Sequence, residues 1–282
     1  MGTLLELRIL LPLSVEEYQK AQLYTIGQLS LQETGSDTGV EILKNEHFTD
    51  DAEFGSGQYT KKVIHAGSKA PKFAAAILPK SVLSLREEAW NSYPACKTVQ
   101  TNDFLGKKFK ITITTKHLAD NGTSENVHEL GEKELAKRKV RYINIFSDSV
   151  SKGVFDENPR EFKSAKTGRG RYGEGWESTE TQVMCCYKLV EIRCSMLGLG
   201  GYVEKKIKES AVEIAYKTHG KMICSMDEWI DLTMEDVREI EKDVKEKLDK
   251  KMVDSGLKTE ETIATTENFE TGSSIASETK FE

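Results

Sequence analysis

No apolar run in this 282-residue sequence comes near the roughly 20 residues that a transmembrane helix requires. The apolar N-terminal stretch, TLLELRILL at residues 3–11, is interrupted by Glu6 and Arg8. It also lacks the basic region and the small-residue cleavage site of a signal peptide, so we interpret it as a first β-strand. With 38% hydrophobic residues, the chain can bury a sizeable core in one large domain or two small ones.

Cysteine is scarce and irregularly spaced. The sequence has five cysteines, an odd number, and none of them forms a C-x-x-C pair. Disulfide frameworks and structural zinc sites both need regular spacing, so we expect free thiols in a reducing, cytoplasmic compartment. The five histidines show no metal-ligand spacing either. The sequence therefore predicts no metal and no cofactor.

An excess of basic charge and a nucleotide-binding loop are also missing. The net charge of −6 argues against a broad nucleic-acid-binding surface. The stretch GRGRYG at 168–173 matches G-x-G-x-x-G, but it follows no hydrophobic strand and opens no clear helix, so a dinucleotide site is disfavoured. Only Lys97 lies close enough in sequence to activate the thiol of Cys96, and no Cys–His–acid arrangement is evident. We therefore predict that the protein is not an enzyme.

The hydrophobic pattern predicts many strands, one early helix and several late helices. A capping box at Ser14 and Glu17 opens a helix that runs to about residue 31. Further helices are expected at 132–139, from 199 onward and at 233–252. The expected strands are 4–11, 40–43, 58–65, 94–100, 109–116, 140–146 and 183–196. This order favours an α+β fold in which helices cover a large antiparallel sheet.

The C-terminal segment differs in composition from the rest of the chain. Residues 254–282 are rich in Ser, Thr and Glu and poor in apolar residues, which is typical of disorder. We therefore expect one domain at residues 1–253 and a disordered tail at 254–282.

Several polar residues fall on otherwise apolar faces. Lys188 lies in the middle of an apolar row in the strand 183–196, and Thr115 ends the apolar row of the strand 109–116. In the strand 58–65, either face places a lysine inside; one of them carries Thr60 and Lys62. Glu241 falls near the centre of the apolar stripe of the last helix.

Each of these residues has an ordinary structural explanation. A lysine can snorkel, a threonine can end a strand, and a helix carboxylate can form a tertiary salt bridge. Taken together, they indicate a polar pocket inside an apolar cavity. Lysines, hydroxyls and a carboxylate suit a phosphorylated, polyhydroxylated ligand.

Seven segments, spread over residues 8–241, resemble the single-domain (class I) phosphatidylinositol transfer proteins. They are RILLPLSVEEYQKAQLY (8–24), GQYTKKVIH (57–65), EEAWNSYPACKTV (87–99), ENVHEL (125–130), FKSAKTGRG (162–170), MCCYKLV (184–190) and MDEWIDLTMEDVREIE (226–241). The resemblance implies a helix-grip (START-like) fold, in which a curved antiparallel sheet and long helices enclose one lipid-sized cavity.

The resemblance also implies roles for individual residues. The inositol ring would be held by Thr60, Lys62, Asn91 and Glu241. The lipid phosphate would be held by Gln22, Thr98, Thr115 and Lys188.

Other implied features concern regulation and docking. Cys96 would be a cavity thiol whose alkylation blocks loading, and Ser164 matches a phosphorylation position of the family. Met196 and Leu197 stand where the animal proteins often carry a membrane-docking tryptophan pair; they are apolar but lack the interfacial preference of an indole. Arg171 replaces a usual proline.

The resemblance implies a phospholipid transfer protein that exchanges phosphatidylinositol for phosphatidylcholine between membranes. The lipid is its cargo, and no cofactor is implied. We expect a cytoplasmic monomer that visits the Golgi, endoplasmic reticulum or plasma membrane transiently. A lipid sensor, or a presenter of lipid to a phosphoinositide kinase, would need the same pocket and remains the alternative.

Overall fold

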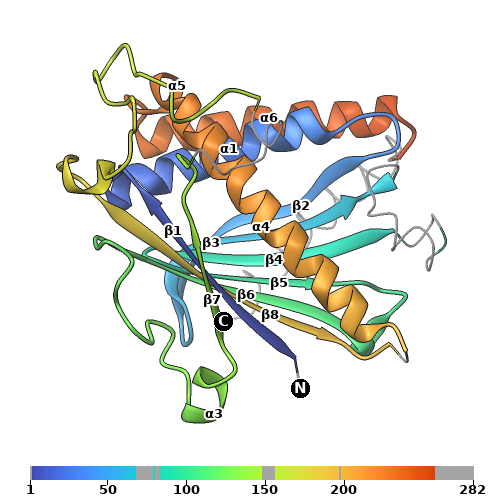
Figure 1. The fold of residues 1–282 in the computed structure, drawn as a ribbon. Coiled ribbons are helices and arrows are strands. Elements are labelled where there is room, and N and C mark those ends of the chain that lie inside the picture. The colour runs from blue at the N-terminus through green and yellow to red at the C-terminus, as the bar shows by residue number, and fades with distance from the viewer. Residues whose placement is uncertain (1, 68–78, 80–82, 148–155, 197, 258–282) are drawn as a thin grey trace, which may run out of the picture.

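The computed structural model describes residues 2–67, 79, 83–147, 156–196 and 198–257. Its largest element is one curved eight-stranded sheet with the order β2-β3-β4-β5-β6-β8-β1-β7 (Figure 1). The strands are β1 (Thr3–Leu11), β2 (Gly39–Asp51), β3 (Gly55–His65), β4 (Ser84–Ser92), β5 (Ala95–Thr101), β6 (Phe109–Leu118), β7 (Lys139–Ile143) and β8 (Met184–Cys194). All neighbouring pairs are antiparallel except β1 and β7.

Three long helices cover one face of this sheet (Figure 1). They are α1 (Val15–Glu33), α4 (Gly200–Cys224) and α6 (Met234–Asp254), while α3 (Glu132–Leu135), α5 (Met226–Trp229), η3 (Gly106–Lys108) and η4 (Trp176–Ser178) are short. The predicted α+β class and helix-grip architecture are confirmed. The predicted boundary at residue 253 stays a prediction, and residues 258–282 of the expected tail lie outside the described residues.

Helices α1 and α6 begin at the residues that the sequence predicts. Ser14 and Glu17 form a reciprocal capping box at the start of α1, and Thr233 and Asp236 form another at the start of α6. Each box satisfies backbone N–H groups that a helix start leaves without partners. Helices α1 and α6 then approach closely, because Gly27 leaves room for Val244: a Cβ at Gly27 would lie 3.3 Å from that side chain.

The sequence analysis missed parts of the sheet. Strand β2 continues to Asp51, well beyond the predicted 40–43, and β4 was not predicted at all. Strand β4 carries charged side chains on both faces, so it lacks the alternation that marks a half-buried strand. It forms because β3 and β5 pair with it on both sides, and tertiary pairing overrides local composition.

The apolar rows predicted for β6, β8 and α6 do face the interior. Phe109, Ile111 and Val190 are buried on the sheet, and Val237 and Val244 are buried on α6.

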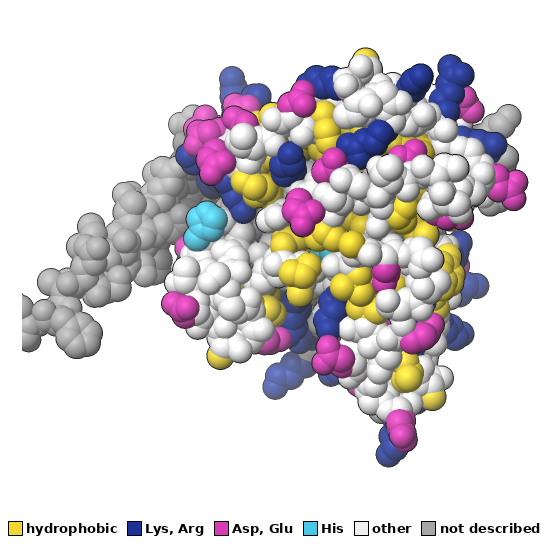
Figure 2. All heavy atoms as spheres, turned by 90° about the vertical axis from the view of Figure 1, so that its left-hand side faces the viewer, with side chains coloured by type: hydrophobic (Ala, Val, Ile, Leu, Met, Phe, Trp, Pro, Cys, Tyr) yellow, Lys and Arg dark blue, Asp and Glu magenta, His cyan; other side chains and the backbone are white. Residues whose placement is uncertain are grey.

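At the end of the molecule where α1 begins, the surface carries acidic and basic side chains interspersed (Figure 2).

The opposite face of β1 carries a buried ionic network. The Glu6 carboxylate accepts hydrogen bonds from Arg8 Nε and from Arg138 Nη1, both at 2.7 Å. The side chains of Glu6 and Arg8 are almost fully buried, and Arg8 also donates to the carbonyl oxygen of Gly122 at 2.8 Å. The network fastens the segment that follows β6 onto the outer side of the sheet.

We predict that Glu6→Ala lowers the free energy of unfolding by about 3–5 kcal/mol, because both guanidinium groups lose their buried carboxylate. Urea unfolding followed by circular dichroism measures the change. Glu213→Gln, which removes the exposed ion pair with Lys217 on α4, should cost less than about 1 kcal/mol. A loss at Glu6 as small as the loss at Glu213 would contradict the assignment.

Candidate functional site

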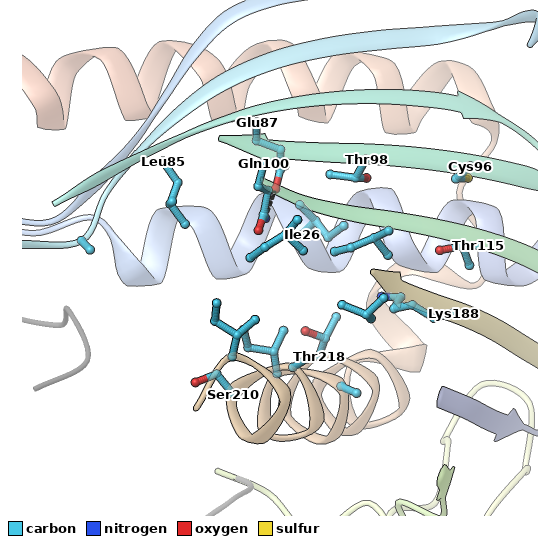
Figure 3. A pocket seen from close by; sticks show the side chains of 18 of the residues that line it. Ile26, Leu85, Glu87, Cys96, Thr98, Gln100, Thr115, Lys188, Ser210 and Thr218 are labelled. Atoms are coloured by element: carbon cyan, nitrogen blue, oxygen red, sulfur yellow. Dashed lines mark hydrogen bonds between the residues drawn. The ribbon is translucent and has the colours of Figure 1, made fainter. Parts of the chain in front are cut away.

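A cavity of about 530 Å³ lies between the inner face of the sheet and helices α1 and α4 (Figure 3). Most of its lining is apolar and comes from β4, β5, β6, β8 and the two helices. The apolar lining includes Ile26, Leu83, Leu85, Leu105, Phe109, Ile111, Ile113, Val190, Met196, Val203, Ile207 and Ile214. A cavity of this size and character suits an apolar ligand with a few polar groups at defined places.

One polar row crosses the sheet at one end of the cavity. Asn91 on β4 pairs with Cys96 on β5, Cys96 pairs with Thr115 on β6, and Thr115 pairs with Lys188 on β8. All four line the cavity, and Thr98 lies two residues further along β5 on the same face. The register of four strands therefore brings together five residues from three separate stretches of the sequence.

Lys188 is the charged member of this row. Its side chain is half-buried, and within the described part of the chain no carboxylate pairs with it. The hydroxyls of Thr98 and Thr115 and the amide of Asn91 likewise have no hydrogen-bond partner among the described residues. A cation with free donors around it, in an apolar setting, is a site for a phosphate-like anion.

Two buried histidines lie close to this charge. Burial, together with the nearby Lys188 charge, lowers the pKa of His219 to about 3. Burial also lowers the pKa of His117 to about 4, with Lys188 acting in the same direction. Both histidines are therefore neutral at pH 7, and the Lys188 charge is left for a ligand to neutralise.

Helix α1 contributes Gln22 and Tyr18 to the same end of the cavity. Tyr93 donates a hydrogen bond to the side-chain oxygen of Gln22, and the Tyr18 hydroxyl lies 3.0 Å from Nε2 of His219. The sequence analysis found no metal-ligand spacing among the histidines, assigned them no other role, and missed Tyr18. The one available signal was that Tyr18 and Gln22 are four residues apart, on one face of the helix.

The inner face of β3 is the one that carries Thr60 and Lys62. In the register of β3 and β4, Lys62 lies opposite Glu87 and Thr60 lies opposite Ala89. Both residues therefore share the sheet face of Asn91, which lies opposite Gln58. Lys61 points outward, where it lies 3.4 Å from Glu88. The sequence left open whether Lys61 or Lys62 faces the interior, and the structure shows that it is Lys62.

These residues do not line the cavity, however. The Thr60 hydroxyl donates to Oδ1 of Asn45 at 3.1 Å. Glu241 lies in the stripe between Val237 and Val244 and forms an ion pair with Arg238 of its own helix. The structure thus gathers the predicted phosphate ligands and Asn91 around one cavity, whereas Thr60, Lys62 and Glu241 lie outside it.

The predicted modification site is enclosed. Ser164 is 1% exposed, and its hydroxyl donates to the Asp227 carboxylate, which also accepts from the backbone N–H of Ala165 at 2.8 Å. In the same segment, Arg169 makes a two-pronged contact with Glu17 at 2.9 and 3.0 Å. A kinase could reach Ser164 only after this segment had moved.

The predicted docking pair is described only in part. Met196 lines the cavity beside the start of α4, while Leu197 lies outside the described residues. Within the ranges described, no group of three or more His, Cys, Asp or Glu side chains could hold a metal ion. Nor does that part of the chain contain a helix with the length and apolarity needed to cross a membrane.

Comparisons with known proteins agree with these features. The profile of a family described as phosphatidylinositol transfer protein matches residues 3–246. The chain is 42% identical over 249 residues to phosphatidylinositol transfer protein 2 of Dictyostelium discoideum, covering 88% of this chain and 95% of that protein. It is 40% identical over 252 residues to the human phosphatidylinositol transfer protein beta isoform, covering 86% and 92% of the two chains.

We predict slow, strongly pH-dependent alkylation of Cys96. Burial raises the pKa of its thiol from 9.0 to about 12, so at neutral pH its thiolate is about a thousandfold rarer than that of an ordinary cysteine. The rate with N-ethylmaleimide should rise about tenfold for each pH unit between 7 and 9. Mass spectrometry of the Cys96 peptide measures the rate of alkylation at each pH, and the same peptide from denatured protein is the control. A rate equal to the control would contradict the burial of this thiol.

Proposed function

Because this chain belongs to the phosphatidylinositol transfer protein family, we propose that it carries one phosphatidylinositol or phosphatidylcholine at a time and exchanges it between membranes. The acyl chains occupy the apolar cavity, and no covalent chemistry is needed. The observation that carries this proposal is the unpaired, half-buried Lys188 in the wall of that cavity. A zwitterionic or anionic phospholipid supplies the missing anion and the apolar chains in one molecule.

The phosphate is held by groups that do not depend on the headgroup. Lys188 contributes the charge, and the free hydroxyls of Thr98 and Thr115 donate hydrogen bonds. Gln22 completes the site from helix α1, where Tyr93 orients its side chain. Since every phospholipid has this phosphate, both proposed cargoes use the same grip.

Inositol selectivity comes from a second set of groups. Thr60, Lys62, Asn91 and Glu241 offer hydrogen bonds to ring hydroxyls that choline cannot make. In the structure Thr60 donates to Asn45 and Glu241 pairs with Arg238, so a ring hydroxyl would use the remaining lone pairs of these two side chains or replace their present partners. Selectivity follows because the amide of Asn91, which has no partner among the described residues, would stay unpaired beside choline, and a buried polar group left unpaired is costly.

We predict that Glu241→Ala abolishes transfer of phosphatidylinositol and preserves transfer of phosphatidylcholine. Lys188→Met should lower transfer of both about 10- to 100-fold, because it removes the charged hydrogen bond to the shared phosphate. Transfer of labelled lipid from donor to acceptor vesicles measures both. Glu239→Ala, which breaks an exposed ion pair on the same helix, is the matched control.

Two outcomes of this assay would contradict the proposal. Equal loss of both lipids in Glu241→Ala would remove Glu241 from the inositol site. A wild-type protein that binds lipid but moves none between vesicles would favour a lipid sensor or a presenter to a phosphoinositide kinase. Such a protein needs the same pocket but no exchange.

Membrane docking is proposed at the end of the cavity where Met196 lies. The connection between β5 and β6 and the connection between β8 and α4 run side by side there, since Ser195 N–H donates to the Lys108 carbonyl at 2.8 Å. Phe104 in the first of these connections and Tyr202 in the first turn of α4 are 61% and 50% exposed. They supply aromatic surface where Met196 and Leu197 supply none.

The charge at this end suits an anionic bilayer. Lys107, Lys108 and Lys205 are exposed and form no salt bridge with any residue that the structure describes. Asp103, the acidic neighbour, is already paired with Arg86 at 2.6 Å. Each such lysine contributes roughly 1 kcal/mol at an anionic membrane surface.

We predict that Phe104→Ala weakens binding to phosphatidylserine-containing vesicles about three- to tenfold, because it removes apolar area that enters the interface. Co-sedimentation with vesicles measures binding. Val140→Ala, on the edge strand β7 and also exposed, is the control and should bind like the wild type. Unchanged binding of Phe104→Ala would place the docking surface elsewhere.

A further inference from the structure

A polar pair interrupts the apolar wall of the cavity. Gln100 on β5 donates a hydrogen bond from Nε2 to Glu87 on β4 at 2.7 Å, and both side chains line the cavity. The two residues lie opposite each other in the register of β4 and β5, and Ile111 on β6 lies opposite Gln100. Gln100 lies four residues along β5 from Cys96, which places this pair about 13 Å from the row of Lys188.

The helix wall carries polar groups as well. Ser210 and Thr218 on α4 line the cavity among Ile207, Ala211 and Ile214. Neither hydroxyl has a hydrogen-bond partner among the residues that the structure describes. Figure 3 shows Glu87 and Gln100 projecting from the sheet toward the helix on which Ser210 and Thr218 lie. We call Glu87, Gln100, Ser210 and Thr218 the polar band.

An unsubstituted acyl chain is a poor match for this band. If the phosphate lies at Lys188, a chain that follows the cavity passes the polar band near its middle. Plain methylenes there would exclude water and leave the oxygen atoms of the band without partners, which is costly. A ligand with a hydrogen-bonding group at that depth removes the cost.

The chemistry of the band selects the kind of group. On the sheet wall, the free carboxylate oxygen of Glu87 and the side-chain oxygen of Gln100 can only accept hydrogen bonds. On the helix wall, the hydroxyls of Ser210 and Thr218 can donate. The matching substituent both donates and accepts, as a hydroxyl or hydroperoxyl does and as a ketone or an epoxide does not.

We propose that the polar band is a second recognition site, which binds the hydroxyl or hydroperoxyl group of an oxygenated acyl chain. The protein would then select phospholipids by chain as well as by headgroup, and carry oxygenated species out of the membrane in which they form. This inference rests on the proposed function, because it requires a phospholipid in the cavity with its phosphate at Lys188.

The test is a competition between two chains on one headgroup. The purified protein is incubated with vesicles that contain equal amounts of phosphatidylcholine with a linoleoyl or a mid-chain hydroxylinoleoyl group. It is then re-isolated, and its bound lipid is identified by mass spectrometry. We expect the hydroxylated species to be enriched at least about fivefold over the vesicle ratio, the factor expected from one net hydrogen bond. A hydroperoxy chain should behave alike, and a keto chain, which can accept from the hydroxyls on the helix wall but cannot donate to Glu87 or Gln100, should be enriched less.

Two variants separate recognition from loading. Gln100→Leu and Thr218→Val keep the shape of the wall but remove polar atoms on opposite sides, and each should reduce the enrichment while total loading stays unchanged. Ile111→Val, in the same row as Gln100, is the matched control and should keep the enrichment. Equal loading of the two chains by the wild type, or full enrichment in both polar-band variants, would overturn the proposal. Failure to load either lipid would instead contradict the proposed function.

Discussion

Side chains alternate between the two faces of a strand, and in this protein that alternation decides what can line the cavity. Every second residue of β4, β5, β6 and β8 faces the helices, and the register aligns Asn91, Cys96, Thr115 and Lys188 in one row. A shift of any strand by one residue would turn its member of the row outward. The polar end of the cavity therefore depends on correct pairing along the whole sheet, more than on any single contact.

The helices hold the other wall in place through contacts made outside the cavity. Lys20 on α1 donates to the carbonyl oxygens of Ile230 and Leu232, at 3.0 and 2.8 Å, in the connection between α5 and α6. Arg169 ties the start of α1 to the segment that encloses Ser164. Opening the cavity on the α1 side would have to break polar contacts of this kind, whereas on the α4 side the sheet is held by Glu204, which accepts from Thr3 at 2.7 Å and from Cys194 N–H at 3.4 Å. The two helical walls thus differ in what resists their movement.

Much of this arrangement could be predicted from the sequence where the pattern was strong. Period-two alternation placed Thr115 and Lys188 inside, the capping box at Ser14 and Glu17 located the start of α1, and the helical pattern from residue 233 located the start of α6. Strand β4 could not be found this way, because its charged residues satisfy neither a strand nor a helix pattern until β3 and β5 pair with it. Asn91 and Thr98 were predicted only from the family resemblance, since a short polar segment has no face of its own.

In the candidate site, too, some features follow from the sequence pattern and others depend on tertiary packing. The buried position of Tyr18 and His219 depends on how α1 and α4 pack together, which periodicity within one helix does not reveal. Glu241 was correctly placed in the stripe of α6, yet its partner in the structure is Arg238, three residues away. Sequence patterns give the direction of a side chain, but the nearest neighbour in space decides which partner it finds.

The cavity also constrains how such a carrier can work as a vehicle. Outside a membrane, an unloaded molecule would expose an apolar cavity of about 530 Å³ and the uncompensated charge of Lys188 to whatever water could enter. Both are unfavourable, so departure without cargo is disfavoured, and under the proposed exchange each visit ends with one lipid given up and one taken. A carrier of this kind changes the composition of two membranes while leaving the number of lipids in each the same. Its direction is then set by the concentration gradients of its cargoes and not by any energy source of its own.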